Sequence, residues 1–410
     1  MYEDGDRVMP GQRHAASLER EKSYMATIVD REPAIEDFAV TQDALDTLER
    51  LKSRAMQRTG LTDFGSTDFE KPLGLLLDEA IRVPRRLDWE SEIETSLMGR
   101  LVLVDEWKRN PGYKDRTIVA PLVICGIPRT GTTALHKVLS VDPQFQGLNL
   151  WLASWPKPRP PQDRWVDEPG YQHAVALLEK RNADTPGLRA VHEMLVDEVE
   201  ECLEILRYDF VTNRFPSITL MPRYDRWMQA QDQTPSYRNL ADALKLIGLH
   251  DDRRWLLKNP GHFGNLDALF AVFPDARVVI THRDPVKSIG SVCSVLQNPQ
   301  QFMDPNVDLH KVGAREVQFW GDAKAKTDAI RETERGAQIL DVQHKDFHAD
   351  PIGIVRAIYD HAGLVLNPDV EQDMRTWLAQ NPSDKHGQHT YKLSDYGLTE
   401  EGIRAVFGEG

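Results

Sequence analysis

The spacing of apolar residues divides the chain into a helical first part and a mixed second part. Over residues 35–108, apolar positions recur at intervals of three and four, as in ALDTLERLKSRAM and KPLGLLLDEAIRV, which predicts helices. The preceding residues are polar and charged without clear periodicity, which favours a flexible arm. We therefore expect an arm over 1–30, a helical region over 31–115 that packs on the core or on another subunit, and one domain over 116–410.

Beyond Pro111, short β-branched and apolar runs alternate with amphipathic segments. This alternation predicts a parallel sheet whose strands are joined by right-handed helical crossovers. We expect strands at residues 122–125, 255–257, 278–281 and 338–342. Pro121 then stands at the entrance of the first strand, where a missing N–H is tolerated. Between the first two strands, residues 151–252 form a long, largely helical insertion of the kind that shapes a substrate pocket.

The segment GIPRTGTT, residues 126–133, joins the first predicted strand to a predicted helix. Such a turn directs backbone N–H groups and the positive end of the helix dipole at one place, which favours an anion site over a plain tight turn. The spacing nearly matches the phosphate loop G-x-x-x-x-G-K-[ST], but Thr132 replaces the lysine. Arg129 supplies a positive charge instead. The predicted class is therefore a P-loop-type three-layer α/β/α fold with a central parallel sheet.

A second cluster of polar residues follows the next two strands. Lys258 and His262 come after one strand, and His282 and Arg283 after the other, so their carboxyl ends flank the same crevice. Ser291 follows on the next helix. An arginine and a hydroxyl so placed can clamp a second phosphate, although Ser291 taken alone fits a solvent-facing helix serine equally well.

These motifs together resemble a known family. PRTGTT and HRDPVKSIGS resemble the 5′-phosphosulfate and 3′-phosphate motifs of sulfotransferases that use 3′-phosphoadenosine 5′-phosphosulfate (PAPS). From about Leu122 onward the chain looks like the bacterial sulfotransferase family group, whose elements KNPGH, THRDP and HGQHTYKLSDYGL occur in order. The resemblance implies transfer of a sulfuryl group from PAPS to a hydroxyl or amine.

The resemblance also implies roles for individual residues. The 5′-phosphosulfate would be held by Arg129, Thr130, Gly131, Thr132 and Thr133, the 3′-phosphate by Arg283 and Ser291, and a further phosphate contact by Lys385, His386 and Gly387. Lys258 would neutralise charge on the transferring group, and His262 would act as general base. No metal is expected, because a sulfuryl group carries less negative charge than a γ-phosphoryl group.

Three departures from the family pattern leave questions open. Ala134 stands where an aromatic residue stacks on adenine in the cytosolic enzymes, and His344 stands where a tyrosine is usual. LNLWLASWP lacks the carboxylate that serves as base in the tyrosylprotein group. Base function therefore falls to His262 or to the insertion, where HEMLVDEVEECLEIL predicts a helix carrying His192, Glu198 and Glu201 toward the pocket. The His262 imidazole alternatively caps the helix that follows it.

Composition limits the partners. Lys and Arg number 50 against 64 Asp and Glu, a net charge of −14 that disfavours nucleic acids and anionic membranes. Cys125, Cys202 and Cys293 lie far apart, which argues against a disulfide framework or a zinc site. The start of the chain lacks a signal peptide and no apolar run approaches membrane-span length, so we expect a cytoplasmic protein.

The insertion is also rich in aromatic residues, which suggests a partly apolar small-molecule acceptor or simply a core. These residues are Trp151, Trp155, Phe210, Phe215, Tyr224 and Trp227. The helical N-terminal region offers a contact for a homodimer. Two alternative functions remain, a P-loop small-molecule kinase and a catalytically silent nucleotide-binding protein of the same fold.

Overall fold

The structure is a computed structural model that describes residues 39–184, 194–381 and 391–408. The N-terminal helices that the apolar spacing predicts are present as α2 (Gln42–Thr59), α3 (Glu70–Ala80) and α4 (Arg86–Arg109). They share an apolar core with Phe210, Phe215 and Met221 of the insertion. The helical region therefore packs against its own insertion. The predicted arm over 1–30 lies outside the described residues.

The central sheet has five parallel strands in the order β2-β3-β1-β4-β5. They are β1 (Leu122–Cys125), β2 (Phe145–Gly147), β3 (Arg254–Lys258), β4 (Arg277–His282) and β5 (Ile339–Gln343). Four of them confirm the predicted strands. The short β2, with the sequence FQG, shows no apolar run that the sequence pattern could detect.

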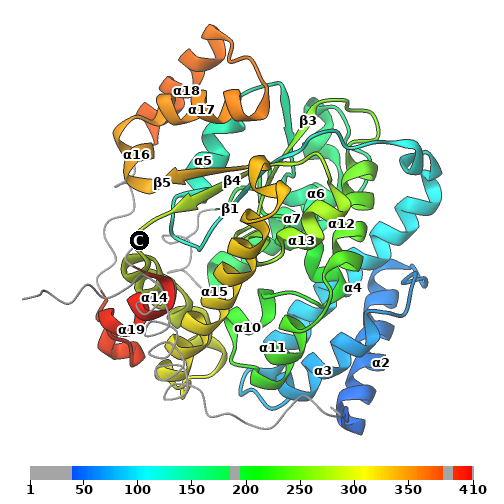
Figure 1. Ribbon diagram of the computed structural model, residues 1–410. Helices are drawn as coiled ribbons and strands as arrows, with labels where there is room; N and C mark the ends of the chain where they lie inside the picture. Colours follow the sequence, from blue (N-terminus) through cyan, green and yellow to red (C-terminus); the bar gives the residue numbers. More distant parts are fainter. Residues whose placement is uncertain (1–38, 185–193, 382–390, 409–410) are drawn as a thin grey trace, which may run out of the picture.

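Helices cover both faces of the sheet, as Figure 1 shows. Alternate strand residues belong to different cores, Val123 and Cys125 to one and Leu122 and Ile124 to the other, as the pleat requires. One face is covered by α5 (Thr132–Leu139), α16 (His344–Ala349), α17 (Pro351–Ala362) and α18 (Pro368–Gln380). The other is covered by α6 (Leu150–Ser154), α12 (Thr234–Ile247), α13 (Leu266–Val272), α14 (Pro285–Met303) and α15 (Leu309–Arg331). The predicted three-layer α/β/α fold is confirmed.

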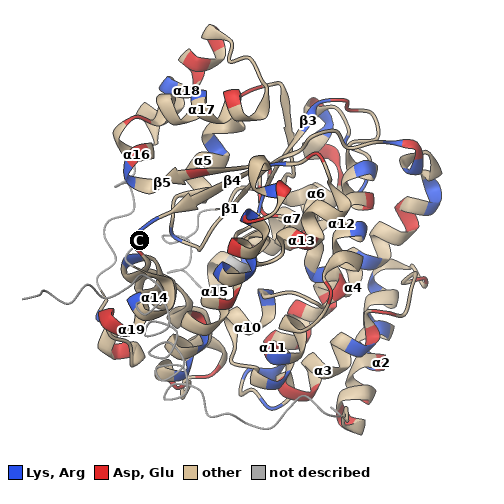
Figure 2. Cartoon of the chain, viewed as in Figure 1, with Lys and Arg blue, Asp and Glu red and all other residues tan. Residues whose placement is uncertain are grey.

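The remaining helices belong mainly to the insertion and the connections. They are α7 (Pro169–Asp184), α9 (Leu203–Leu206), α10 (Arg214–Ile218), α11 (Pro222–Gln229) and α19 (Glu400–Phe407). Short 3-10 turns are η1 (Pro111–Asp115), η2 (Gln162–Asp167), η3 (Arg207–Asp209), η4 (Pro260–Gly264), η5 (Glu334–Gln338) and η6 (Leu393–Tyr396). Charged residues concentrate on the helices and leave most of the sheet uncharged (Figure 2). Over the described ranges, no helix is both long and apolar enough to span a bilayer.

One predicted helix of the insertion is wrong. The segment HEMLVDEVEECLEIL does not form one helix: in its described part, helix α9 begins only at Leu203. The residues before it run antiparallel to the chain around Asn149, with the Glu200 amide donating to the Leu148 carbonyl at 2.7 Å and the Leu150 amide to the Glu198 carbonyl at 3.1 Å. These hydrogen bonds to residues 148–150 engage backbone groups that, in a helix, would bond to other residues of the same segment.

Candidate active site

The loop between β1 and α5 has the backbone conformation of an anion-binding turn. Gly126 and Gly131 have φ of 143° and 97°, and Arg129, at 71°, lies in the left-handed region although it is not a glycine. A Cβ on Gly126 would lie 2.5 Å from the Thr281 carbonyl oxygen, so no other residue fits there without a shift. Helix α5 begins at Thr132, which places its N-terminus at the loop.

The hydroxyl of Thr130 stabilises this loop from within. It donates to the Ile127 carbonyl at 2.7 Å and lies 2.6 Å from the Thr281 hydroxyl on β4, in a buried position. The Thr130 hydroxyl is therefore engaged in shaping the loop, whereas Thr132 and Thr133 line the adjoining cavity.

The structure brings the two predicted phosphate motifs into contact. The Arg129 Nε donates to the Ser291 Oγ at 3.2 Å, and the Arg283 Nη1 donates to the Arg129 carbonyl at 3.1 Å. Ser291 is buried, so it is no solvent-facing helix serine. The pKa of the Arg129 guanidinium is lowered by desolvation and by the positive charge of Arg283. Two neighbouring cations beside a helix N-terminus favour an anionic ligand.

Lys258 stands at the carboxyl end of β3, next to this loop. Its side chain is 1% exposed, and its Nζ lies 2.6 Å from the Glu201 Oε1 and 3.4 Å from the Thr133 Oγ1. Glu201 is positioned through its backbone, because its amide donates to the Glu200 carboxylate and the following amide, of Cys202, donates to the Lys258 carbonyl. Lys258 therefore links the loop to an acidic residue of the insertion.

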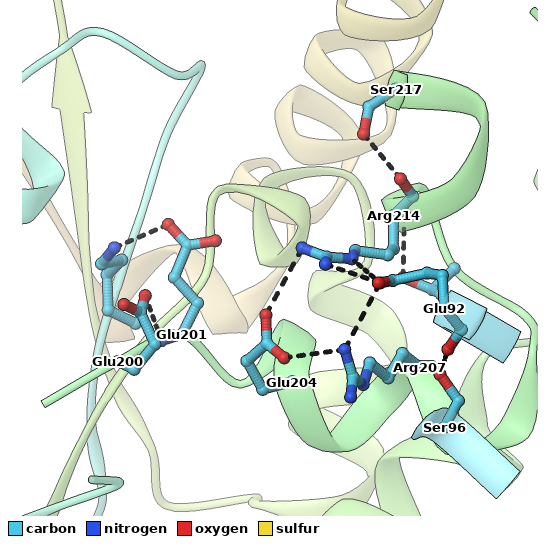
Figure 3. A network of polar contacts seen from close by, with 10 residues as sticks. Glu92, Ser96, Glu200, Glu201, Glu204, Arg207, Arg214 and Ser217 are labelled. Atoms are coloured by element: carbon cyan, nitrogen blue, oxygen red, sulfur yellow. Dashed lines mark hydrogen bonds and ion pairs between the residues drawn. The ribbon is translucent and has the colours of Figure 1, made fainter. Parts of the chain in front are cut away.

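Beyond Glu201 the insertion carries an ion network, drawn in Figure 3. The guanidinium of Arg214 contacts the Glu92 Oε1 through Nη2 at 2.7 Å and Nε at 3.1 Å, and the Glu204 Oε1 through Nη1 at 3.4 Å. Arg207 lies 3.4 Å from Glu92 and 3.2 Å from Glu204. Burial acts to lower the pKa of Arg214, but the charges of Glu92 and Glu204 raise it overall. The network holds Arg214 charged and in place.

A cavity of about 460 Å³ connects the loop to an apolar region. At one end lie Arg129, Thr132, Thr133 and Glu201, and Glu92 and Arg214 also line it. Its apolar lining comes from the insertion, from α14 and from α15, and includes Leu203, Leu206, Ile218, Val292, Leu296 and Phe319. None of the six aromatic residues singled out in the insertion belongs to the lining. Of the two alternatives for these aromatic residues, the core is confirmed and the acceptor pocket is wrong, because five of the six are buried in the core and Trp155 packs against it.

His262 is buried and does not line the cavity, although Pro260 and Gly261 beside it do. It is 0% exposed, and its Nδ1 is 2.6 Å from the hydroxyl of Tyr237, which does line the cavity. Burial lowers the pKa of His262 to about 3. The next helix begins after Asn265, and the imidazole bonds Tyr237 instead of capping it.

Among the described residues, Glu198 is the remaining predicted site residue; it pairs with Lys137 at 2.5 Å and does not line the cavity. His192 and the group Lys385, His386 and Gly387 lie outside the described residues. His344 packs over the loop, since its Cδ2 lies 3.2 Å from the position of a Cβ on Gly131. Its pKa is lowered to about 4 by burial and by the charges of Arg283 and His348.

Sequence reasoning missed Glu92, Arg214 and Tyr237. Glu92 comes from a helix that carried no motif, and Arg214 and Tyr237 lie in parts of the insertion without a recognisable spacing. The one signal available for Arg214 was that it is the single charged residue of the stretch VTNRFPSI. As for metals, the described part of the chain brings together no group of three His, Cys, Asp or Glu suited to hold an ion.

A parallel α/β/α fold with a modified phosphate loop and a second cationic clamp is typical of sulfotransferases, and the comparison with protein families agrees. Residues 121–368 match the model of the sulfotransferase family. The chain belongs to this family.

The chain is also similar to individual sulfotransferases, in sequence and in structure. The omega-hydroxy-beta-dihydromenaquinone-9 sulfotransferases Stf3 of Mycobacterium bovis and Mycobacterium tuberculosis are each 26% identical over 305 residues, covering 72% of this chain and 74% of theirs. The crystal structure of sulfotransferase STF1 from Mycobacterium tuberculosis H37Rv matches with a TM-score of 0.79 at 37% identity, over 88% of this chain and 97% of that one. Sulfotransferase STF9 from Mycobacterium avium matches with a TM-score of 0.81 at 28% identity, over 91% and 97%. These findings support sulfotransferase activity.

Proposed function

We propose that this protein transfers a sulfuryl group from PAPS to a hydroxyl, or an amine, of a small and largely apolar acceptor. The observation that carries the proposal is the contact of Arg129 with both Ser291 and Arg283, which joins the phosphate loop and the second clamp into one cationic surface. A donor with phosphates at two positions of one nucleoside needs such a surface. The adjoining apolar cavity supplies room for the acceptor.

In the proposed reaction the acceptor oxygen forms a bond to sulfur while the bond from sulfur to the 5′-phosphate oxygen breaks. The acceptor proton passes to a base, and 3′-phosphoadenosine 5′-phosphate leaves. Arg129, the loop N–H groups and Lys258 stabilise the negative charge that develops on the leaving oxygen. The chemistry needs no bridging metal, because a sulfuryl group carries less charge than a phosphoryl group.

We propose Glu201 as the base in place of His262. Glu201 lines the cavity, its side chain is 18% exposed, and it lies beside Lys258 at the end of the phosphate loop. Its second carboxylate oxygen is available for the acceptor proton while the first accepts from Lys258. His262 is fully buried, outside the lining, and has its pKa depressed to about 3, so it accepts a proton poorly.

The acceptor is proposed from the cavity and from a relative. The apolar lining fits a hydrocarbon body, and Stf3, 26% identical, is named for an omega-hydroxylated menaquinone. An apolar molecule with an accessible hydroxyl is therefore the class that we propose. A cytoplasmic location and a homodimer through the N-terminal region complete the proposal.

Calorimetric titration with 3′-phosphoadenosine 5′-phosphate and with ATP·Mg²⁺ tests the donor. The proposal expects clear preference for the 3′-phosphorylated nucleotide, and the loss of most of that preference in Arg283→Ala. Equal or tighter binding of ATP·Mg²⁺ would favour the kinase alternative. Tight nucleotide binding without transfer to any alcohol or amine would favour the catalytically silent alternative.

A further inference from the structure

Arg214 is the feature of the cavity that transfer chemistry alone does not require. Its side chain is 21% exposed and lines the cavity, whose lining also includes apolar residues such as Leu206 and Ile218. The guanidinium of Arg214 and the carboxylate of Glu201 face each other in Figure 3, and the charge of Glu201 contributes to the raised pKa of Arg214. A group bound at Arg214 would therefore lie close to a hydroxyl that reacts at Glu201.

The guanidinium of Arg214 has more N–H groups than its contacts with Glu92 and Glu204 use. A guanidinium has five N–H groups. The contacts to Glu92 and Glu204 use one on each of its three nitrogens. Considering the described residues, one N–H on each terminal nitrogen is left for a ligand in the cavity. Because Glu92 and Glu204 fix the orientation, little side-chain entropy is lost when that ligand binds.

The charges around Arg214 select a neutral partner. Three carboxylates, of Glu92, Glu201 and Glu204, are joined by contacts to three cations, of Arg207, Arg214 and Lys258, so their charges cancel. An anionic acceptor group would meet the three carboxylates, and a cationic group would meet the guanidinium. A neutral oxygen accepts from the spare N–H groups without either repulsion.

We propose that Arg214 recognises a second, neutral oxygen of the acceptor, next to the hydroxyl that is sulfated. The acceptor class is thus an amphipathic molecule with an apolar body and a head that carries a hydroxyl beside a carbonyl, ether or second hydroxyl oxygen. This inference rests on the proposed sulfotransferase function and names the substrate class of the same cavity.

Binding of three matched probes tests the proposal without knowledge of the natural acceptor. 1-Octanol, 1,2-octanediol and 2-hydroxyoctanoate are titrated calorimetrically into wild-type protein saturated with 3′-phosphoadenosine 5′-phosphate. We expect 1,2-octanediol to bind at least about 10-fold more tightly than 1-octanol, as a hydrogen bond to a charged group allows. Equal affinities, or tightest binding of 2-hydroxyoctanoate, overturn the proposal.

Variants separate recognition from stability. In Arg214→Met combined with Glu92→Gln, which removes one carboxylate along with the guanidinium, the preference for the diol should fall below about 3-fold, whereas 1-octanol affinity should change little. Arg223→Met is the matched control, because Arg223 pairs with the buried Asp78 outside the cavity, at 2.6 Å, and should keep the preference. A double variant that folds and retains the wild-type preference overturns the role of Arg214.

The results also distinguish failure of the proposed role of Arg214 from failure of the proposed sulfotransferase function. Failure of 3′-phosphoadenosine 5′-phosphate to bind contradicts the proposed donor, and the three probes are then titrated without nucleotide against the same expectation. Normal nucleotide binding without diol preference contradicts only the inference on Arg214.

Discussion

The pairing of Lys258 with Glu201 is the residue-scale feature on which the proposed chemistry depends. The Lys258 side chain is 1% exposed, lies beside the phosphate loop and contacts the carboxylate of Glu201, which lines the cavity. The same contact holds the Glu201 carboxylate at the lining of the cavity, beside the phosphate loop. In the proposed mechanism, one side chain thus stabilises the leaving group and positions the base.

Replacement of Glu201 tests this arrangement. Glu201→Gln should lower kcat by about 100-fold or more, the usual contribution of a general base, while nucleotide affinity changes less than about 3-fold. Glu198→Gln is the control, because it makes the same substitution at a glutamate that does not line the cavity, and it should keep kcat. Steady-state sulfate transfer with titration of the nucleotide measures both. A Glu201→Gln enzyme with normal kcat contradicts the role of Glu201.

The buried imidazole of His262 predicts a pH effect on stability. Its pKa is about 3 in the folded protein against 6.5 ordinarily, so between these values the unfolded chain binds more protons. The contribution of neutral His262 to the free energy of unfolding is therefore fully present above pH 6.5 and is lost as the pH falls toward 3. The loss approaches about 1.4 kcal/mol per pH unit for this group.

His262→Gln should flatten that dependence. Urea unfolding of the wild type and the variant across this pH range gives the two slopes, and the difference between them isolates His262 from His136, which is also buried with a pKa of about 3. Parallel slopes would mean that His262 is not buried in its neutral form. The comparison uses slopes because loss of the Tyr237 bond lowers stability at every pH.

At the scale of elements, the strand-loop-helix unit depends on Gly126. Its φ of 143° and the 2.5 Å approach of the Thr281 carbonyl leave no space for a side chain. Gly126→Ala should weaken nucleotide binding by about 10-fold or more, since a strained backbone of this kind costs on the order of 1–3 kcal/mol and displaces the loop N–H groups. Gly112→Ala is the control, because a Cβ there meets nothing within 4 Å. Thermal unfolding shows whether both variants fold, and unchanged affinity in a folded Gly126→Ala would contradict the loop's role.

The insertion shows where element prediction from sequence stops. Its helices follow from local apolar spacing, but the stretch before Leu203 pairs with the chain around Asn149 and with Lys258. Such pairing depends on segments far apart in the sequence, which periodicity within the stretch does not register. Glu201 lies in the stretch that was wrongly predicted as a helix. Lys258 and Glu201 were therefore both predicted for the site, but the contact between them was not.

For the whole molecule, the sequence predicted the parallel sheet and the meeting of two phosphate motifs at its carboxyl edge. Both follow from topology, because strands β1, β3 and β4 are adjacent and parallel. The acceptor cavity was not predictable in the same way. Its lining combines α4, α14, α15 and the insertion, and the aromatic residues chosen for it lie in the core, where large apolar side chains are usually buried.

Transfer of label from ³⁵S-labelled PAPS to 1,2-octanediol tests the central claim most directly. The wild type should form a labelled sulfate ester, and Lys258→Met should form at least about 100-fold less, because the leaving oxygen loses its cation. The measurement is made at saturating donor, with nucleotide binding checked in both proteins. Absence of any labelled sulfate ester or sulfamate from a wild-type enzyme that binds the donor, across alcohols and amines alike, would contradict the proposal that this chain is a PAPS-dependent sulfotransferase.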